Sequence, residues 1–364
     1  MVIGAYFLVF AAALSVSLFA ARGSAWLGDY FGITAQRGGR RQSASDRRGV
    51  SKLGGLSIFL GFVVAALLAQ LLPIPRHDPL EIIRFIGLLL GAIFIFAVGI
   101  IDDLMDLSPL TLYVAQLIAA GIAILFLIFI EFVNNPFTGN QTDAFPWWVT
   151  VVVSLFWLGT MMNTVNFLDG LDGLAAGVAL IASILLFANS AFVLYPPQTS
   201  VSLLPLALMG ACAGFLLYNF QPARVIMGGS AYLLGYLLGT LSIIGGAKMA
   251  TILLVMGLPL MDLAWQAVNR VTQGRNPLFG DRGHLHYRLL DSGWFSERQI
   301  VLAYYAFAAI FGSLTLFIES RFYKFIALSL MAALIALGFW LVVRLGEKKA
   351  RTEMADSSDE SVAR

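Results

Sequence analysis

Long apolar runs follow one another along almost the whole of this chain, and they constrain its fold more than any other feature. A helix that crosses a membrane needs roughly 20 mostly apolar residues. Eleven stretches come close to that length: residues 2–21, 53–72, 80–101, 109–130, 147–162, 173–195, 201–220, 230–246, 249–268, 300–318 and 322–343. We therefore predict an all-α polytopic membrane protein with about eleven transmembrane helices. Residues 1–346 would form one transmembrane domain, and 347–364 a polar, disordered cytoplasmic tail.

The composition supports this fold and excludes several classes of protein. Hydrophobic residues make up 59% of the 364 residues and charged residues only 12%, about half of the roughly 25% found in soluble domains. So low a charge is incompatible with a soluble enzyme, a disordered chain or a nucleic-acid-binding module. The single cysteine, Cys212, excludes an intrachain disulfide.

The basic residues predict how the helices are oriented. If the N-terminus lies outside, most of the 23 Lys and Arg residues fall in the inner segments. These are residues 22–52, 102–108, 163–172, 221–229, 269–299 and the tail. Basic residues concentrate on the cytoplasmic side of membrane proteins, so we predict an outer N-terminus and a cytoplasmic C-terminus. Three clusters of polar residues then lie on the cytoplasmic side.

The first cluster is a set of three aspartates at the end of the stretch 80–101. Acidic residues at the ends of membrane helices are costly and are functional by default. On a helix, Asp102 and Asp106 share a face and Asp103 lies beside them. Three neighbouring carboxylates repel one another unless a cation joins them, and oxygen ligands suit Mg²⁺ or Mn²⁺. The alternative is a solvated helix end without a ligand.

The second cluster places two amides and two carboxylates at intervals of three residues. They are Asn163, Asn166, Asp169 and Asp172, accompanied by Gly170, Gly173 and Gly177. Such groups over two helical turns can hydrogen-bond a nucleoside and hold a metal-bound diphosphate, and glycine lets the backbone approach a ligand closely. The alternative is a glycine-rich turn capped by Asn and Asp, which explains one or two of these residues but not the regular set.

The third cluster lies in the last long inner segment, where His284 and His286 are accompanied by Arg275, Arg282 and Arg288. Two histidines at i and i+2 do not share a helix face, so we expect no zinc site on a helix. Imidazole and guanidinium groups suit the oxygens of a diphosphate. A basic inner loop is the alternative, and it accounts for the arginines but not for two of the chain's 3 histidines.

A run of arginines that ends at Arg47 and Arg48 is followed by Gly54-Gly55 at the start of the second apolar stretch. These charges can bind anionic lipid head groups or a lipid phosphate. A role in topology alone fits them equally well, and the glycine pair favours function.

These four blocks, in this order, resemble the polyprenyl-phosphate N-acetylhexosamine-1-phosphate transferase family, also called glycosyltransferase family 4. The signatures of that family are a glycine pair opening the second span, a DDxxD after the third, an NxxNxxDGxDGLA block and a late cytoplasmic loop with histidines. Here they read Gly54-Gly55, Asp102-Asp103-Leu104-Met105-Asp106, Asn163 to Ala175, and His284-Leu285-His286. The stretch Gly274 to Pro277 is similar to the WecA-like branch, which uses UDP-N-acetylglucosamine.

The resemblance implies that a polyprenyl phosphate, such as undecaprenyl phosphate, attacks the β-phosphorus of a UDP-sugar and releases UMP, with Mg²⁺ or Mn²⁺ as cofactor. As catalytic residues we predict Asp102, Asp103, Asp169, His284 and His286. As metal ligands we predict Asn166, Asp102 and Asp103, and as substrate-binding residues Asn163, Gly170, Asp172, Arg275, Arg282 and Arg48. The enzyme would lie in the bacterial inner membrane with its site facing the cytoplasm and would start a lipid-linked surface glycan. A homodimer is compatible with this prediction, and no nucleic-acid partner is expected.

Two positions depart from the family pattern. The family usually has a metal-binding Asp at the start of the eighth span, where this chain reads Met227-Gly228-Gly229-Ser230 and is one residue short. Tyr287 stands where the WecA-like branch more often has histidine. The lost carboxylate leaves a non-catalytic or altered homologue as an alternative, and Tyr287 leaves the donor sugar open.

Three other classes of protein fit the pattern less well. A UDP-MurNAc-pentapeptide transferase usually shows a run of three histidines, which is absent here. An intramembrane prenyl transferase also uses aspartate-rich loops, but the second cluster does not match their DxxxD-like form. A transporter is not favoured, because we expect no charged side chain in the middle of a broken span.

Overall fold

The computed structural model describes residues 2–35, 49–244, 249–275 and 283–362, with side chains up to Leu341. Within these residues the regular elements are helices, together with three isolated β-bridges. The helices are α1 (Val2–Phe31), α2 (Gly55–Leu71), α3 (Glu81–Met105), α4 (Pro109–Leu125), α5 (Trp147–Leu168), α6 (Leu174–Ala188), the π-helix η1 (Asn189–Val193), α7 (Thr199–Asn219), the 3₁₀ turn η2 (Gly228–Ser230), α8 (Ala231–Ile243), α9 (Met249–Val255), α10 (Gly257–Thr272), α11 (Leu285–Asp291), α12 (Glu297–Phe317) and α13 (Arg321–Val362).

Each predicted apolar stretch coincides with a helix or a pair of consecutive helices, so the prediction of an all-α polytopic membrane protein is confirmed. Seven of the described helices are long and apolar enough to cross a membrane, and α9 with α10 makes an eighth if the bent pair is one span. α2 and α4 have 17 residues each and α8 has 13, fewer than the roughly 20 of a full span. Eleven crossings and their direction stay predictions.

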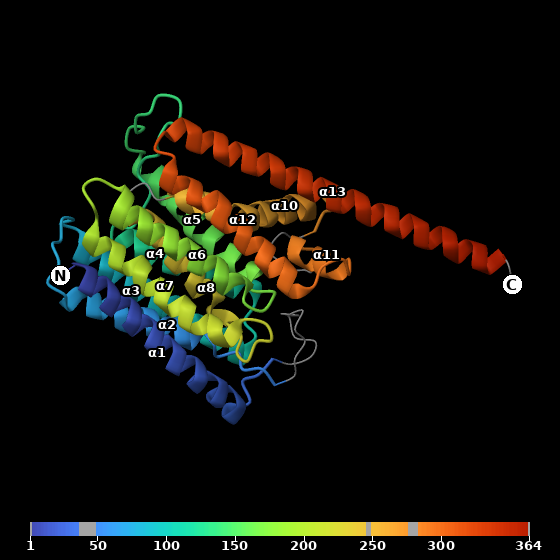
Figure 1. Ribbon diagram of the computed structural model, residues 1–364, viewed down its shortest axis with the longest axis horizontal. Coiled ribbons are helices and arrows are strands. Elements are labelled where there is room, and N and C mark those ends of the chain that lie inside the picture. Colours follow the sequence, from blue (N-terminus) through green and yellow to red (C-terminus); the bar gives the residue numbers. More distant parts are fainter. Residues whose placement is uncertain (1, 36–48, 245–248, 276–282, 363–364) are drawn as a thin grey trace.

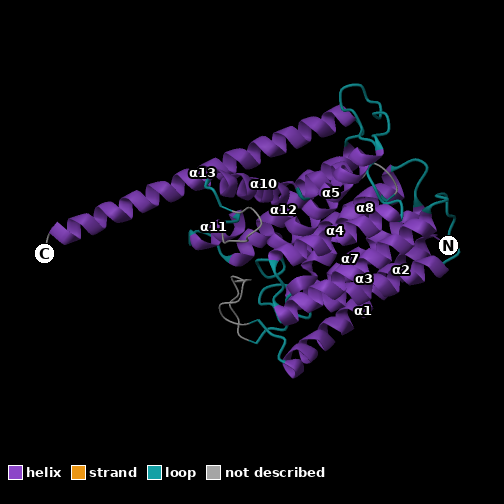
Figure 2. Ribbon diagram, turned by 180° about the vertical axis from the view of Figure 1, so that it is seen from behind, coloured by secondary structure: helices purple, strands orange, loops and turns teal. Residues whose placement is uncertain are grey.

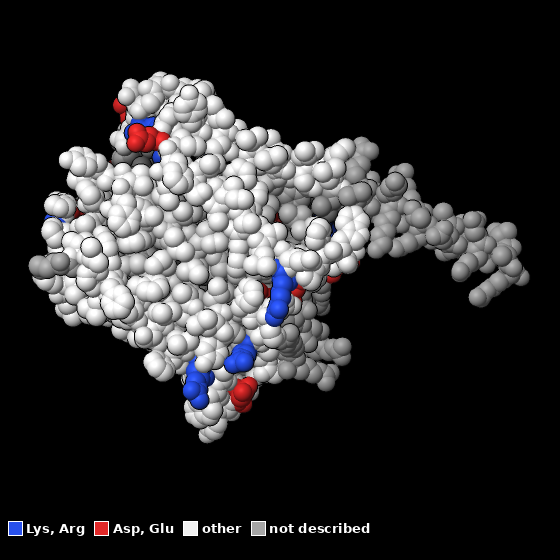
Figure 3. Space-filling model, viewed as in Figure 1, with Lys and Arg blue, Asp and Glu red and all other residues white. Residues whose placement is uncertain are grey.

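Charged side chains are scarce over the middle of the helical bundle. Figure 3 shows a broad uncharged region on the visible face, with Lys, Arg, Asp and Glu toward its two ends. A bilayer imposes this distribution, because a charge in the hydrocarbon region is costly.

Small residues let three helices pack closely on one side of the bundle. α1, α2 and α7 lie side by side (Figure 1). A Cβ at Gly210 or Gly214 of α7 would meet a backbone oxygen of α1 at 2.7 Å, closer than a side chain can come. Ser17 of α1 donates a hydrogen bond to the carbonyl oxygen of Ala211 at 2.7 Å. Such contacts between small residues are typical of membrane helices. In lipid the hydrophobic effect does not drive helices together, so close packing and hydrogen bonds do so instead.

α8 lies inside the bundle and joins α3 to α5. Every residue of α8 from Ala231 to Ser242 is buried. Tyr236 donates a hydrogen bond to the Gly87 carbonyl oxygen of α3 at 3.1 Å, and Trp157 of α5 donates from Nε1 to Ser242 Oγ at 3.1 Å. α8 therefore fixes the two helices whose ends carry the first and second polar clusters.

The predicted span 249–268 is broken into two helices. α9 and α10 meet at an angle of 74°. Pro259 lies in the first turn of α10 and has no backbone N–H to donate to the Val255 carbonyl, so α9 cannot continue as one straight helix. α10 consequently turns to run beside α13 (Figure 1).

α13 extends well beyond the rest of the bundle (Figures 1 and 2). Its backbone is helical as far as Val362, where we expected disorder from residue 347 onward. This segment is rich in Glu, Lys, Ala and Arg, which are good helix formers. The division into a domain and a tail stays a prediction.

Candidate active site

The three aspartates of the first cluster stand at the end of α3, but they do not share one helix face. α3 ends at Met105, and Asp106 follows it in the left-handed conformation with φ 53°. Short polar residues tolerate this conformation, so Asp106 turns the chain instead of continuing the helix. Asp102 is 8% exposed, and its Oδ1 accepts a hydrogen bond from the Leu107 N–H at 3.0 Å.

Asp103 binds the glycine pair of η2. Its Oδ2 accepts a hydrogen bond from the Gly229 N–H at 2.8 Å. Gly228 has a positive φ of 64°, and a Cβ at Gly229 would overlap the carbonyl oxygen of Gly99 in α3. The segment that usually carries a carboxylate in the family thus packs its backbone directly on α3, with no room for a side chain at 229.

The second cluster is divided between α5 and the loop that follows it. Asn163 donates from Nδ2 to Gln116 Oε1 of α4 at 2.6 Å and to the Gly159 carbonyl oxygen at 2.9 Å, so its amide joins two helices. Asn166 has a buried Oδ1 that accepts no hydrogen bond from the described residues. α5 ends at Leu168, and Asp169 caps it.

Asp172 holds the loop after α5 against its neighbours. It is 2% exposed, and its Oδ2 accepts a hydrogen bond from the Ala223 N–H at 2.9 Å. Its own N–H donates to Glu297 Oε1 at 2.9 Å, and Glu297 Oε2 accepts from Gln221 Nε2 at 2.5 Å. The carboxylates of Asp172 and Glu297 therefore brace two loops at one end of the bundle.

Three residues that hold the loop after α5 were not predicted from the sequence: Glu297, Asn219 and Tyr305. Asn219 accepts from the Gly173 N–H at 3.0 Å, and Tyr305 donates to the Gly173 carbonyl oxygen at 2.5 Å. Glu297 carried a usable signal, because it is an acidic residue at the start of an apolar stretch. Asn219 and Tyr305 carried none that distinguishes them from ordinary helix residues.

The histidine segment packs against the end of α5, so the second and third clusters meet. The His284 ring stacks on Phe167 with centroids 4.9 Å apart. A Cβ at Gly170 would lie 2.6 Å from both His286 Nε2 and Tyr287 Oη. His284 and His286 are 2% and 1% exposed. Glycine is therefore required at 170 for the histidine segment to come this close.

A polar face of α10 lies beneath the histidine segment. It consists of Asp262, Gln266 and Arg270, which recur every four residues and are 4%, 1% and 3% exposed. Asp262 Oδ2 lies 2.9 Å from His284 Nδ1. We expected no charged residue within a broken span, whereas Asp262 is buried in α10 of the bent pair formed by α9 and α10. An aspartate inside the apolar stretch 249–268 was a sufficient signal, since such residues are functional by default.

The predicted arginines are less well defined. Arg275 is exposed just after α10, and its N–H donates to the Arg270 carbonyl oxygen at 2.8 Å. Arg48 and Arg282 lie outside the described residues.

Several known proteins are similar to this chain in sequence. A family model described as Glycosyl transferase family 4 matches residues 85–246, which include the first two clusters. Decaprenyl-phosphate N-acetylglucosaminephosphotransferase of Mycobacterium tuberculosis (strain CDC 1551 / Oshkosh) is 33% identical over 71% of this chain and 70% of its own. The chain belongs to glycosyl transferase family 4. It is a phosphoglycosyl transferase of that family.

Two other relatives of this family 4 transferase have names that give different substrates. A probable undecaprenyl-phosphate N-acetylglucosaminyl 1-phosphate transferase of Bacillus subtilis (strain 168) is 30% identical over 74% of this chain and 73% of its own. A phospho-N-acetylmuramoyl-pentapeptide-transferase of Staphylococcus aureus (strain JH9) is 29% identical over 76% of this chain and 87% of its own.

The side chains of this family 4 transferase suit a hard cation whose coordination shell is completed by oxygen atoms of the substrate. In residues 2–35, 49–244, 249–275 and 283–341, no three His, Cys, Asp or Glu side chains form a metal-binding group. Mg²⁺ commonly takes one or two carboxylates, several waters and substrate phosphates instead of a protein cage. The carboxylates of Asp102 and Asp103 and the unpaired Oδ1 of Asn166 are oxygen donors of this kind. The donor chemistry therefore fits Mg²⁺.

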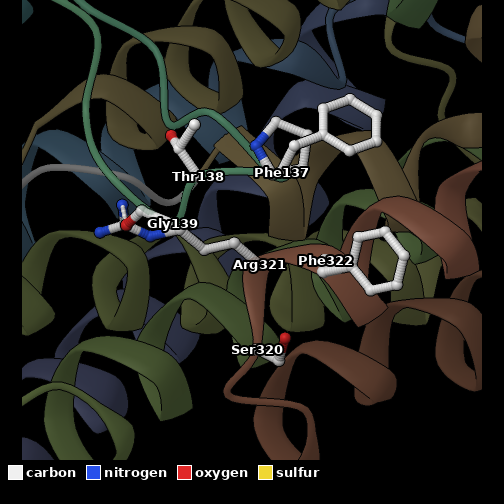
Figure 4. Close-up of a pocket in the computed structure, with 7 residues that line it drawn as sticks. Phe137, Thr138, Gly139, Ser320, Arg321 and Phe322 are labelled. Carbon is white, nitrogen blue, oxygen red and sulfur yellow. Dashed lines mark hydrogen bonds between the residues drawn. The ribbon is translucent and has the colours of Figure 1, made fainter.

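A surface pocket lies between the loop after α4 and the start of α13. It is lined by Pro136, Phe137, Thr138, Gly139, Ser320, Arg321 and Phe322. Figure 4 shows the Arg321 guanidinium beside Gly139, to whose carbonyl oxygen it donates a hydrogen bond. This contact joins the loop after α4 to the start of α13.

Proposed function

We propose that the enzyme transfers N-acetylglucosamine-1-phosphate from UDP-N-acetylglucosamine to undecaprenyl phosphate, releases UMP, and so starts a lipid-linked surface glycan. The observation that carries the proposal is the contact of the second cluster with the third, where Gly170 admits His286 and Tyr287. A nucleoside diphosphate sugar needs both the amides and carboxylates of one cluster and the imidazoles of the other. The names of the mycobacterial and Bacillus relatives support this donor.

The reaction forms one phosphorus–oxygen bond and breaks another. An oxygen of the lipid phosphate attacks the β-phosphorus of the donor, the bond from that phosphorus to the bridging oxygen breaks, and UMP leaves with the bond's electron pair. A phosphate monoester has a second pKa of about 6, so the nucleophile is mostly ionised at neutral pH. A general base is therefore unnecessary, and Asp102 acts by positioning and electrostatics.

The predicted residues take distinct roles in this proposal. Asp102, Asp103 and Asn166 hold Mg²⁺, which neutralises charge on the phosphates when it is bound. His284 and His286 hold the diphosphate and sugar. Asp169 is a catalytic residue, and Asn163, Gly170 and Asp172 bind the donor. Asp172 also holds the loop of Gly170 through its hydrogen bond with Ala223.

The arginines complete the anion-binding surface. Arg275 and Arg282 follow α10 and supply charge for the diphosphate, and Arg48 meets the lipid phosphate. Eleven crossings of a bacterial inner membrane with the site on the cytoplasmic side accord with the basic residues of the inner segments, and the relatives named above are bacterial.

The test is UMP release by the purified protein in detergent with undecaprenyl phosphate, UDP-N-acetylglucosamine and MgCl₂. We expect UMP and lipid-linked N-acetylglucosamine in equal amounts, loss of both on chelation, and loss of both in Asp103→Asn. UDP-N-acetylgalactosamine and UDP-MurNAc-pentapeptide serve as competing donors. UMP released from only one of these would reassign the donor, and no release from any donor would refute transfer.

A further inference from the structure

Asp262 grips the start of the histidine segment at two points. Its Oδ2 lies 2.9 Å from His284 Nδ1, and its Oδ1 accepts a hydrogen bond from the Leu285 N–H at 3.1 Å. The carboxylate is 4% exposed and the imidazole 2%. Because a carboxylate is an acceptor only, Nδ1 of His284 carries the hydrogen in this pair.

The rest of the α10 polar face holds the preceding residue. Gln266 donates from Nε2 to the Gly283 carbonyl oxygen, and Arg288 of α11 donates to the same oxygen from Nε at 2.7 Å. The backbone on both sides of His284 is therefore fixed, and its ring cannot turn without breaking the contact between Nδ1 and Asp262.

The other nitrogen of His284 is left without a partner. Nε2 is buried and has no hydrogen-bond partner in the described part of the chain. The ring stacks on Phe167, and the Arg270 guanidinium lies 6.0 Å from the centre of that same phenyl ring. A buried polar atom without a partner is costly and marks a place where a ligand is missing or a proton is moved.

We propose that Asp262 is a positioning residue that directs Nε2 of His284 to a phosphate oxygen of the UDP-sugar diphosphate. The inference rests on the proposed function for the identity of the donor. By holding Nδ1–H, the carboxylate fixes the tautomer and the ring orientation. It also balances the ring charge when Nε2 carries a proton, which is the form that donates to a phosphate oxygen.

The variants Asp262→Asn, Asp262→Glu and His284→Gln test this role, alone and in the double variant Asp262→Asn/His284→Gln. Asparagine keeps the size and the acceptor for Leu285 but no longer selects the tautomer. We expect kcat to fall about 10- to 100-fold in Asp262→Asn, with KM for undecaprenyl phosphate unchanged. Glutamate should recover part of kcat, and the double variant should be no slower than His284→Gln.

Glu81→Gln is the matched control. Glu81 is a 6% exposed carboxylate at the opposite end of α3, where it accepts a hydrogen bond from Ser200 at 2.7 Å. The same carboxylate-to-amide change there should leave kcat at the wild-type value. Equal losses in Glu81→Gln and Asp262→Asn would overturn the positioning role, because a general loss of structure would then explain both.

¹⁵N spectra of histidine-labelled protein separate this inference from the proposed function, since the chain has only 3 histidines. We expect a protonated Nδ1 for His284 in the wild type, lost in Asp262→Asn, and a shift of the Nε2 signal on adding UDP-N-acetylglucosamine. If the wild type is inactive but shows the protonated Nδ1 and the Nε2 shift, the proposed transfer is refuted and the positioning role of Asp262 is retained. Wild-type kcat in Asp262→Asn, or an Nε2 signal that the nucleotide does not move, overturns it.

Discussion

Gly170 is the point where the loop after α5 meets the histidine segment, and the substitution Gly170→Ala tests that contact. The added Cβ would lie 2.6 Å from His286 Nε2 and Tyr287 Oη, whereas ordinary contacts begin at 3.4 Å. To reach ordinary contact, the two rings must retreat by about 0.8 Å, the difference between these distances. Overpacking of this kind costs about 1–3 kcal/mol. If the cost falls on the geometry of the site, kcat/KM drops by about 5- to 150-fold.

Gly159→Ala is the control, because Gly159 lies within α5 and a Cβ there would meet no side chain or neighbouring helix within 4 Å. Alanine in a helix interior is more stable than glycine by about 0.5–1 kcal/mol, so this variant should be at least as stable as the wild type and fully active. The assay is the initial rate of UMP release against UDP-N-acetylglucosamine concentration, with thermal unfolding measured in the same detergent.

The result that would refute this reasoning is a Gly170→Ala enzyme with the kcat/KM of Gly159→Ala. The histidine segment could then move by that distance without consequence, and its close approach to the loop would not matter for transfer. A Tm that falls while kcat/KM holds would place the cost of overpacking on stability alone.

Three other substitutions probe the supporting contacts. Gly229→Asp puts a side chain over the Gly99 carbonyl oxygen, so size-exclusion chromatography should show loss of folded protein, and a folded variant that needs less Mg²⁺ would contradict the packing argument. Asp172→Ala leaves the buried Ala223 N–H without its acceptor, which should cost about 1–3 kcal/mol and lower the Tm; an unchanged Tm would argue against the brace. Ser296→Ala removes the capping box of α12 and should cost about 1 kcal/mol in denaturant unfolding, with no change in donor KM.

The length of the apolar stretches and the order of the polar motifs are properties of the sequence itself, so both could be predicted without the structure. The apolar stretches predicted the positions of the helices, because a segment surrounded by lipid must satisfy its own backbone hydrogen bonds. The order of the aspartate, asparagine and histidine blocks indicated the family, and the comparisons agree. The lengths of the helices were predicted less well. α8 is shorter than the apolar stretch that predicted it, and its residues from Ala231 to Ser242 are buried by other helices.

Single residues show where local pattern stops being informative. Spacing alone put Asp106 on a face with Asp102, but the left-handed turn after Met105 takes it off the helix. Spacing also grouped Asp172 with the ligand-binding residues, but it could not show that the Oδ2 of Asp172 accepts a hydrogen bond from the N–H of Ala223, 51 residues away.

By itself, then, the sequence determined a helical membrane protein of family 4 with three polar clusters, because hydropathy and motif spacing act within a few turns of one helix. Only the tertiary structure decided that Asp262 holds His284, that Gly170 admits the histidine segment and that Gly229 packs on Gly99. Each of these is a contact between chain segments that come together only after the helices have packed, at distances set by the smallest side chains between them.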